Sequence, residues 1–145
     1  MKTPSSKWRC DVCGELIDGS SNGYVIWKQS SAMKSYGFKI VHKIKCDLKD
    51  HSSSSALDDF LGGDGMAKLL SHLSLGPIKQ NLGQARYTDV RDMDEFVDLI
   101  RRVQTPFYEN ARTKFSSPAL LSDFSDANEV LPYTEEHLKR IAAKY

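Results

Sequence analysis

Cys10-Asp11-Val12-Cys13-Gly14, together with His42 and Cys46, is the most specific pattern in this chain. It uses all three cysteines and one of the four histidines. Three thiolates and an imidazole are a standard tetrahedral ligand set for structural Zn²⁺. The C-x2-C spacing lets one tight turn direct two thiolates at the same ion, and Gly14 supplies the permissive backbone for that turn. We therefore predict a zinc site with the ligands Cys10, Cys13, His42 and Cys46.

The spacing of the last two candidate ligands predicts the local backbone. His42 and Cys46 stand at positions i and i+4, which places both side chains on one face of a helical turn. In a continuous strand they would lie about 13 Å apart, too far to share an ion. We therefore expect the chain to leave extended structure at or just after His42. Four protein ligands also leave no open position for water, so the predicted zinc is structural.

The segment between the ligand pairs predicts a β-hairpin. Residues 23–28 and 36–41 are rich in aromatic and β-branched side chains, and residues 29–35 are polar enough for a loop. The resulting order of knuckle, hairpin and helical turn resembles the treble-clef family of zinc folds. The pattern C-x-x-C-G … G-Y-V … H … C-D is also similar to segments of small actinobacterial and phage-encoded proteins with no assigned activity. This resemblance covers about residues 8–47 and differs from the commoner C-x-x-C … C-x-x-C form in its last pair.

Two other interpretations of the cysteines stay open. Cys10 and Cys13 could form a redox pair at a helix start, as in thioredoxin-like proteins. The preceding Ser5-Ser6-Lys7 is a poor buried strand, however, and Gly14 is a poor second helical residue. The cysteines could also be unliganded core residues. Zinc is the interpretation that uses all of these residues at once.

The sequence from Ser54 onward predicts helices. A short capped element is expected from Ser55-Ala56-Leu57-Asp58 to Gly62-Gly63, and a helix capped by Asp64 over residues 65–75, where Gly76-Pro77 stops it. A third helix opens at Asp92-Met93-Asp94-Glu95 and ends or kinks near Gln104, before Pro106, after which the helical spacing continues. The last helix opens at Pro132-Tyr133-Thr134-Glu135-Glu136. Residues 85–90 read as a strand or a loop, and residues 116–131 as irregular chain.

The expected fold class is α+β. A zinc-knuckle and β-hairpin module over residues 1–50 packs on a helical body over residues 51–145, and the two form one compact unit. The chain of 145 residues, with 40% hydrophobic and 27% charged residues and a net charge of +1, is typical of one soluble globular domain.

Composition also excludes several classes. No apolar stretch approaches the roughly 18 residues that span a bilayer, so we expect no membrane segment. The first eight residues lack the apolar stretch of a secretory signal. Three cysteines argue against a disulfide framework and for a reducing compartment, so the expected location is the cytoplasm.

Nucleic-acid binding is a second candidate function. Residues 1–50 carry a net charge of +4, and aromatic side chains there, such as Trp8 and Trp27, could stack on bases, although filling a small core explains them better. Residues 69–78 resemble the opening helix and Gly-Pro turn of winged-helix regulators, which implies DNA reading. The next helix, however, opens with Asp92, Asp94 and Glu95, and these would repel phosphate.

Motifs of catalysis are missing from the sequence. It has no G-x-S-x-G, no P-loop and no H-E-x-x-H, and Gly62-Gly63-Asp64-Gly65 reads as a turn between helices. His72 and His137 read as surface residues, and His51 stands beside a run of serines, Ser52 to Ser55. We therefore predict a zinc-stabilised, non-catalytic binding protein that recognises a protein partner. The alternative is a nucleic-acid-binding transcriptional regulator with a winged-helix-like C-terminal part.

Overall fold

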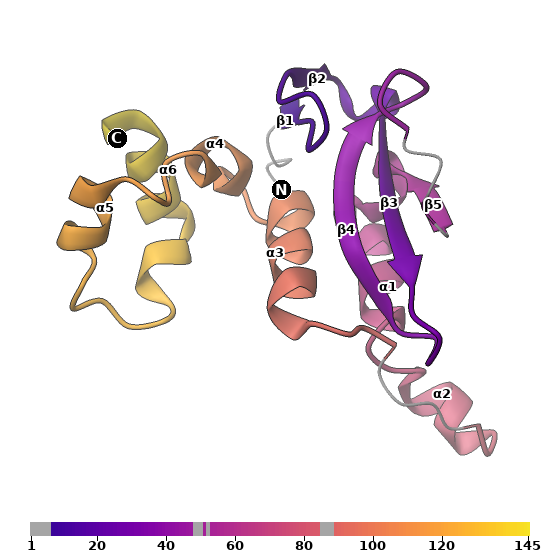
Figure 1. Ribbon diagram of the computed structural model, residues 1–145. Helices are drawn as coiled ribbons and strands as arrows, with labels where there is room; N and C mark the ends of the chain where they lie inside the picture. Colours follow the sequence, from indigo (N-terminus) through magenta and orange to yellow (C-terminus); the bar gives the residue numbers. More distant parts are fainter. Residues whose placement is uncertain (1–6, 48–50, 52, 85–88) are drawn as a thin grey trace.

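The computed structural model describes residues 7–47, 51, 53–84 and 89–145 of the chain. It contains α-helices and antiparallel sheets, which confirms the α+β class (Figure 1). The strands are β1 (Lys7–Arg9), β2 (Leu16–Asp18), β3 (Gly23–Gln29), β4 (Ser35–His42) and β5 (Ser53–Ala56). The 3₁₀ helices are η1 (Ser20–Asn22), η2 (Leu57–Phe60) and η3 (Leu131–Tyr133). The α-helices are α1 (Gly62–Ser71), α2 (Gly76–Asn81), α3 (Met93–Gln104), α4 (Tyr108–Arg112), α5 (Pro118–Asp123) and α6 (Glu135–Lys144).

The β3–β4 hairpin is the frame of the fold. Its register pairs Gly23 with His42, so the strands predicted over residues 23–28 and 36–41 are confirmed, and each is slightly longer than expected. Their β-branched and aromatic side chains suit a pleated, half-buried surface. The end of β4 therefore lies at the same end of the molecule as β1 and β2 (Figure 1).

Helix α3 is attached to this hairpin through a β-bulge. The pairing shifts between Ile26 and Lys28 of β3, and the N–H of Phe38 on β4 donates to the Glu95 carboxylate at 2.9 Å. Glu95 lies in the first turn of α3. Asp92 caps this helix, and its side chain accepts a hydrogen bond from the N–H of Glu95. The capped helix start that the sequence predicts is thus also the point where α3 meets the sheet.

Residues 53–56 form the strand β5, which the sequence did not predict. β5 pairs antiparallel with the second edge of β3, with Ser53 opposite Trp27 and Ala56 opposite Tyr24. The expected capped helix start at Ser55 is therefore wrong, and only the short η2 follows. The backbone N–H and C=O groups of a central strand need partners on both sides, and an extended polar segment can supply them.

Two helix boundaries near glycines also differ from the expectation. α1 begins at Gly62, where a stop was predicted, and it ends at Ser71 instead of residue 75. Gly76 and Pro77 then open α2. Proline is well tolerated in the first helical turn because its missing N–H would have no helical partner there.

The later helices follow their capping signals. α3 ends at Gln104 as predicted, and Thr134 caps α6 with its side chain. Residues 116–131, expected to be irregular, contain α5, which Ser117 caps. In the segment expected as a strand or loop, residues 85–88 lie outside the described part of the chain.

The buried side chains of the described residues form two clusters. The larger one extends from Trp8 to Val103 and fills the space between the sheet, α1 and α3. The smaller one joins α4, α5 and α6, which stand apart from the sheet in Figure 1; its buried members are Tyr108, Ala111, Leu120, Leu138 and Ile141. The division into modules at residue 50 stays a prediction. Among the described residues, no helix has the length and apolar character needed to cross a membrane.

Candidate metal centre

The first ligand pair lies in a tight turn between β1 and β2. The N–H of Gly14 donates to the carbonyl of Cys10 at 3.0 Å, and the N–H of Cys10 donates to that of Glu15 at 2.9 Å. Gly14 has a φ of +78°, the left-handed conformation that glycine adopts without strain. The turn brings Cys10 and Cys13 together, as the C-x2-C spacing predicts.

The second pair lies where β4 ends. His42 is the last residue of β4, and Cys46 lies in the turn that follows. The predicted departure from extended structure after His42 is confirmed, but the helical turn is wrong. Ile44 has a φ of +63°, which no α-helix accommodates, and the N–H of Lys45 donates to the carbonyl of Lys43 at 2.6 Å. The chain makes an irregular turn that still returns Cys46 to His42.

All four predicted ligands converge. One ligand atom from each of Cys10, Cys13, His42 and Cys46 lies within 4.8 Å of the others. The Nδ1 atom of His42 is 3.5 Å from Sγ of Cys13 and 3.7 Å from Sγ of Cys46. Ligands about 2.0–2.3 Å from a tetrahedral Zn²⁺ are separated by roughly 3.5–3.8 Å. The residues therefore fit a metal ion and are consistent with zinc, although their positions do not identify the ion.

The backbone sets the orientation of the imidazole. Nε2 of His42 lies 3.1 Å from the carbonyl oxygen of Leu16. A carbonyl oxygen only accepts hydrogen bonds, so Nε2 carries the proton and donates, and the lone pair of Nδ1 faces the thiols. Such a contact behind the ligand fixes the ring and its tautomer in metal sites.

The thiols differ in acidity. Burial of Cys10 acts to raise its pKa, but hydrogen bonds from the backbone at Cys13 and Val12 and from His42 lower that pKa to about 6. Burial raises the pKa of Cys46, and the neighbouring thiols raise it further, to about 11. The Cys10 thiolate therefore forms readily at neutral pH, whereas burial and the neighbouring thiols oppose ionisation of Cys46, and a cation bound between them would offset that repulsion.

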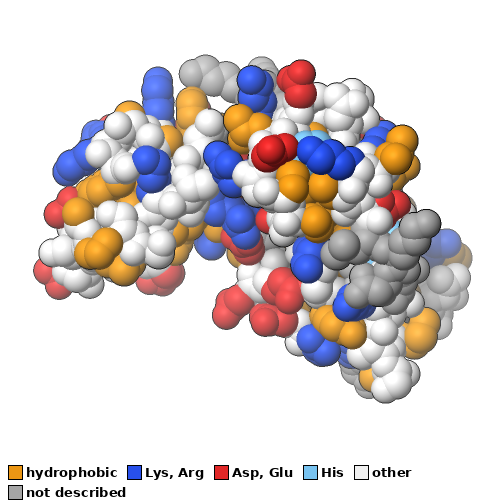
Figure 2. Space-filling model, turned by 45° about the horizontal axis from the view of Figure 1, so that its top comes forward, with side chains coloured by type: hydrophobic (Ala, Val, Ile, Leu, Met, Phe, Trp, Pro, Cys, Tyr) orange, Lys and Arg blue, Asp and Glu red, His pale blue; other side chains and the backbone are white. Residues whose placement is uncertain are grey.

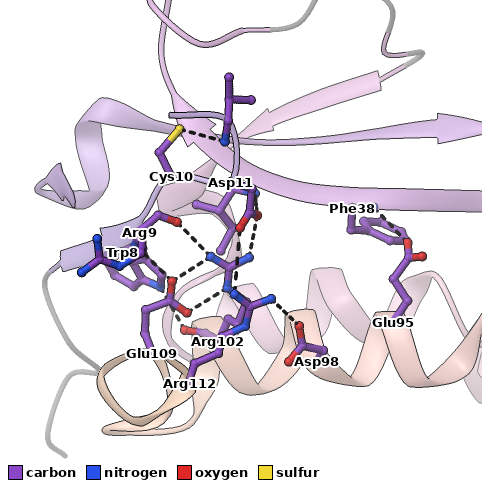
Figure 3. Close-up of polar contacts among 12 residues, drawn as sticks. Trp8, Arg9, Cys10, Asp11, Phe38, Glu95, Asp98, Arg102, Glu109 and Arg112 are labelled. Atoms are coloured by element: carbon purple, nitrogen blue, oxygen red, sulfur yellow. Dashed lines mark hydrogen bonds and ion pairs between the residues drawn. The ribbon is translucent and has the colours of Figure 1, made fainter. Parts of the chain in front are cut away.

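Asp11, between the two cysteines of the turn, connects it to β4. Its N–H donates to the carbonyl of Ile40, and its Oδ2 accepts from the N–H of Ile40, both at 2.8 Å. The same Oδ2 accepts from Nη1 of Arg102 at 2.6 Å (Figure 3). The turn that contains Cys10 and Cys13 is thus held against the hairpin and against α3.

Arg102 is the centre of a buried polar network. Its Nε and Nη2 donate to the two carboxylate oxygens of Glu109 at 2.8 and 2.7 Å, and Nη2 also donates to the carbonyl of Arg9 at 3.1 Å (Figure 3). The Trp8 indole donates to the carbonyl of Arg102 at 2.9 Å. Burial acts to lower the pKa of Arg102, but Glu109 and Asp11 raise it above its usual value.

The sequence analysis missed Arg102 and Glu109. The contact between Asp11 and Arg102 crosses 91 residues, so no local spacing indicates it. One signal was available: Arg102 follows Leu99 by three residues and precedes Val103, which places an arginine on the apolar face of its helix. A charged residue on such a face needs a buried partner.

Other side chains named in the sequence analysis are buried or partly buried. Trp8 and Trp27 are only 2% and 8% exposed, as expected if they fill the core. His72, expected on the surface, instead packs against the rings of Trp27 and Phe96, and its Nδ1 lies 3.6 Å from Oδ1 of Asp89. These tryptophans are therefore not available for stacking on bases.

The two remaining histidines have local partners. His51 pairs with Asp47 at 2.8 Å, and His137 with the hydroxyl of Thr134 at 2.8 Å. Neither residue is among the four that converge at the candidate metal centre.

No protein-family model matches the chain, and the searches of curated proteins and of solved structures found no significant match. The case for a function therefore rests on the metal centre and its surroundings.

Proposed function

We propose that this protein is a zinc-stabilised, non-catalytic binding module that recognises a protein partner in a reducing compartment such as the cytoplasm. The observation that carries the proposal is the convergence of Cys10, Cys13, His42 and Cys46. Three thiolates and one imidazole favour zinc and complete its tetrahedral shell. The ion would supply on the order of 10 kcal/mol of apparent binding free energy. That stabilisation suits a module whose strands β1 and β2 have three residues each.

The surface around the metal centre supports recognition of a protein. Val12 lies between Cys10 and Cys13 in the sequence, Ile44 lies between His42 and Cys46, and the carbonyl of Leu16 contacts the ring of His42. These three residues are 42%, 92% and 49% exposed, and we call them the knuckle surface. Apolar side chains gathered on a surface mark contact sites for partners. Figure 2 shows hydrophobic side chains interspersed with charged ones at this end of the molecule.

The backbone at Ile44 strengthens this argument. A β-branched residue at a φ of +63° is strained, and such strain concentrates at functional sites. Lys43 and Lys45 flank Ile44 in the sequence. The best-matched partner is therefore a protein segment that carries apolar side chains and carboxylates.

The alternative, a nucleic-acid-binding regulator, has weaker support. Trp8 and Trp27 are buried and so do not offer the open aromatic platform on which single strands stack. The acidic first turn of α3 would repel phosphate in a winged-helix mode of binding.

Metal analysis tests the zinc part of the proposal. Chelator-washed protein reloaded with zinc should hold about one zinc per chain by elemental mass spectrometry. Cys13→Ser should lose the metal and lower the Tm by at least about 10 °C, because a structural zinc contributes several kcal/mol. Val12→Ser, in the same turn, is the matched control and should keep both the metal and the wild-type Tm. Wild-type stability of Cys13→Ser at saturating zinc would contradict a structural metal.

A binding selection tests recognition. Peptides selected from a displayed random library against the zinc-loaded protein should carry apolar and acidic side chains. Ile44→Asp should weaken the binding of these peptides about tenfold or more. Ile78→Asp is the control, since Ile78 is 76% exposed on α2 at the opposite end of the molecule (Figure 1). Equal binding to both variants would exclude the knuckle surface. Tight binding to random duplex DNA that falls steeply with salt would favour the alternative function.

A further inference from the structure

We infer that Arg102 is a positioning residue for the metal centre: it sets the affinity for the metal without contacting any of the four ligand side chains. This inference rests on the proposed metal site and adds a residue of α3, far away in sequence, to its function. The observation behind it is that the guanidinium of Arg102 binds both residues that flank Cys10 (Figure 3).

The contacts of Arg102 hold the first ligand pair from both sides. Nη2 donates to the carbonyl of Arg9, directly before Cys10, and Nη1 donates to the carboxylate of Asp11, directly after it. Glu109 binds the opposite edge of the guanidinium with both of its oxygens. This bidentate contact fixes the plane and direction of the donors. The backbone around Cys10 is therefore anchored to a rigid helix.

Asp11 extends the same contact to the second ligand pair. Its Oδ2 accepts from both Arg102 and the N–H of Ile40. Ile40 stands two residues before His42 on β4. One carboxylate oxygen of Asp11 therefore fixes the position of the cysteine turn relative to the strand that carries His42. The geometry between the two ligand pairs is thus set jointly by Ile40, Asp11 and Arg102.

Stability alone does not account for this arrangement. Arg102 is 3% exposed and Glu109 is 7% exposed. Replacing a buried ion pair by apolar residues of similar volume is often neutral or stabilising. A charged pair at this position is better explained by the direction of its donors, because an apolar side chain would fill the space without fixing Arg9 or Asp11.

The consequence follows from thermodynamic linkage. Holding the turn against β4 before the metal arrives reduces the conformational entropy that binding must overcome. Because linkage is reciprocal, the metal must strengthen the contacts of Arg102 by the same factor by which Arg102 strengthens metal binding. Removing the guanidinium should therefore weaken the metal site even though all four ligands remain.

A Co²⁺ titration tests this inference. Co²⁺ reports the ligand set through its thiolate and ligand-field absorption bands, and its Kd follows from the titration. Arg102→Met should raise that Kd about tenfold or more, the range typical of residues that support metal ligands. The bands at saturation should keep their tetrahedral form, since the ligands are unchanged. Far-UV circular dichroism of the saturated variant verifies that it is folded.

Arg101→Met is the matched control. Its guanidinium lies over the ring of Tyr133, 4.2 Å from the ring centre, in the same helix. This variant should bind Co²⁺ as the wild type does. Equal Kd values for Arg102→Met and wild type, or equal weakening by Arg101→Met, would overturn the inference. No Co²⁺ or Zn²⁺ binding by the wild type would instead contradict the proposed metal site itself.

Asp11→Asn provides a second test if Arg102→Met does not fold. The amide oxygen can still accept from the N–H of Ile40, but the charge that faces Arg102 is lost. We expect weaker Co²⁺ binding, and an unchanged Kd would contradict the inference. Asp18→Asn, at an exposed position of β2, is the control. Where the single variants fold, the double variant Asp11→Asn/Arg102→Met should weaken Co²⁺ binding by less than the sum of the two single effects. The reason is that both substitutions remove the same contact, the one between Asp11 and Arg102.

Discussion

At the scale of single residues, Tyr108 connects α4 to α3 through a buried phenol. Its hydroxyl donates to Oδ1 of Asp98 at 2.6 Å, while Arg112 donates to the other oxygen at 3.1 Å. Burial raises the pKa of Tyr108, and the Asp98 carboxylate raises it further. The folded protein therefore retains the phenolic proton at a pH where the unfolded chain has released it.

This pKa shift predicts a loss of stability in alkali. The contribution of Tyr108 is fully present below the pKa of an unfolded tyrosine, about 10, and is lost as the pH rises from there toward the raised folded-state pKa. Urea unfolding of zinc-loaded protein between pH 8 and 11 measures the decline. Tyr108→Phe should make it shallower while costing about 1 kcal/mol at pH 8 for the lost hydrogen bond. An unchanged slope would show that this ionisation does not govern alkaline unfolding.

Residue chemistry also explains what the sequence could reveal of the metal centre. Cysteine and histidine are the soft ligands of zinc, and within each pair their spacing is local, so all four candidate ligands could be named in advance. Arg102 and Glu109 could not, because their partners Asp11 and Arg9 are more than 90 residues away in the sequence. Only the position of Arg102 on an apolar helix face indicated that it had a buried partner.

At the scale of elements, the contact between α1 and η2 depends on one glycine. A Cβ atom at Gly65 would lie 2.1 Å from the backbone carbon of Phe60, whereas nothing lies within 4 Å of a Cβ at Gly63. Both residues belong to α1. Alanine favours a helix over glycine by up to about 1 kcal/mol when there is room for its methyl group. Alanine substitutions at these two positions therefore separate the effect of helix propensity from the effect of packing.

The expected results are opposite in sign. Gly65→Ala should destabilise the protein by roughly 1–3 kcal/mol, because the backbone of η2 must move away. Gly63→Ala should be neutral or stabilise it by up to about 1 kcal/mol. Urea midpoints of the two variants at saturating zinc measure both effects. If Gly65→Ala were as stable as Gly63→Ala, the close approach of α1 to Phe60 would be wrong.

Elements were predictable where the signal was local. The hairpin strands follow from residue type, and α3 and α6 follow from their capping residues and apolar spacing. β5 was missed because its Ser-Ser-Ser-Ala sequence has no side-chain pattern of a strand; its conformation comes from the unpaired edge of β3. The turn at Ile44 was missed because the i, i+4 spacing of His42 and Cys46 fits a helix equally well.

At the scale of the whole molecule, the sheet and the C-terminal helices have separate buried clusters. The smaller cluster, around α4–α6, has too few buried side chains for a stable core of its own. It is joined to the larger one through the bidentate contact of Arg102 with Glu109 and the contact of Arg101 with Tyr133. The α+β class was predictable from the order of the elements, but this junction is built from long-range contacts that no local pattern encodes.

The junction predicts that the two clusters unfold together. In zinc-loaded wild type, the slowest-exchanging amides of α6 should open with the same free energy as those of β3 in native-state hydrogen exchange, because α6 is stable only while α4 is held against α3 by Arg102 and Asp98. Glu109→Gln should lower the opening free energy of α6 selectively, by up to about 3–5 kcal/mol, because it leaves the buried guanidinium with an incomplete set of partners. Glu136→Gln, which removes only the exposed pair with Arg140, is the control. If α6 already opened more easily than β3 in the wild type, the C-terminal helices would be an independent unit, and Arg102 would serve the metal centre alone.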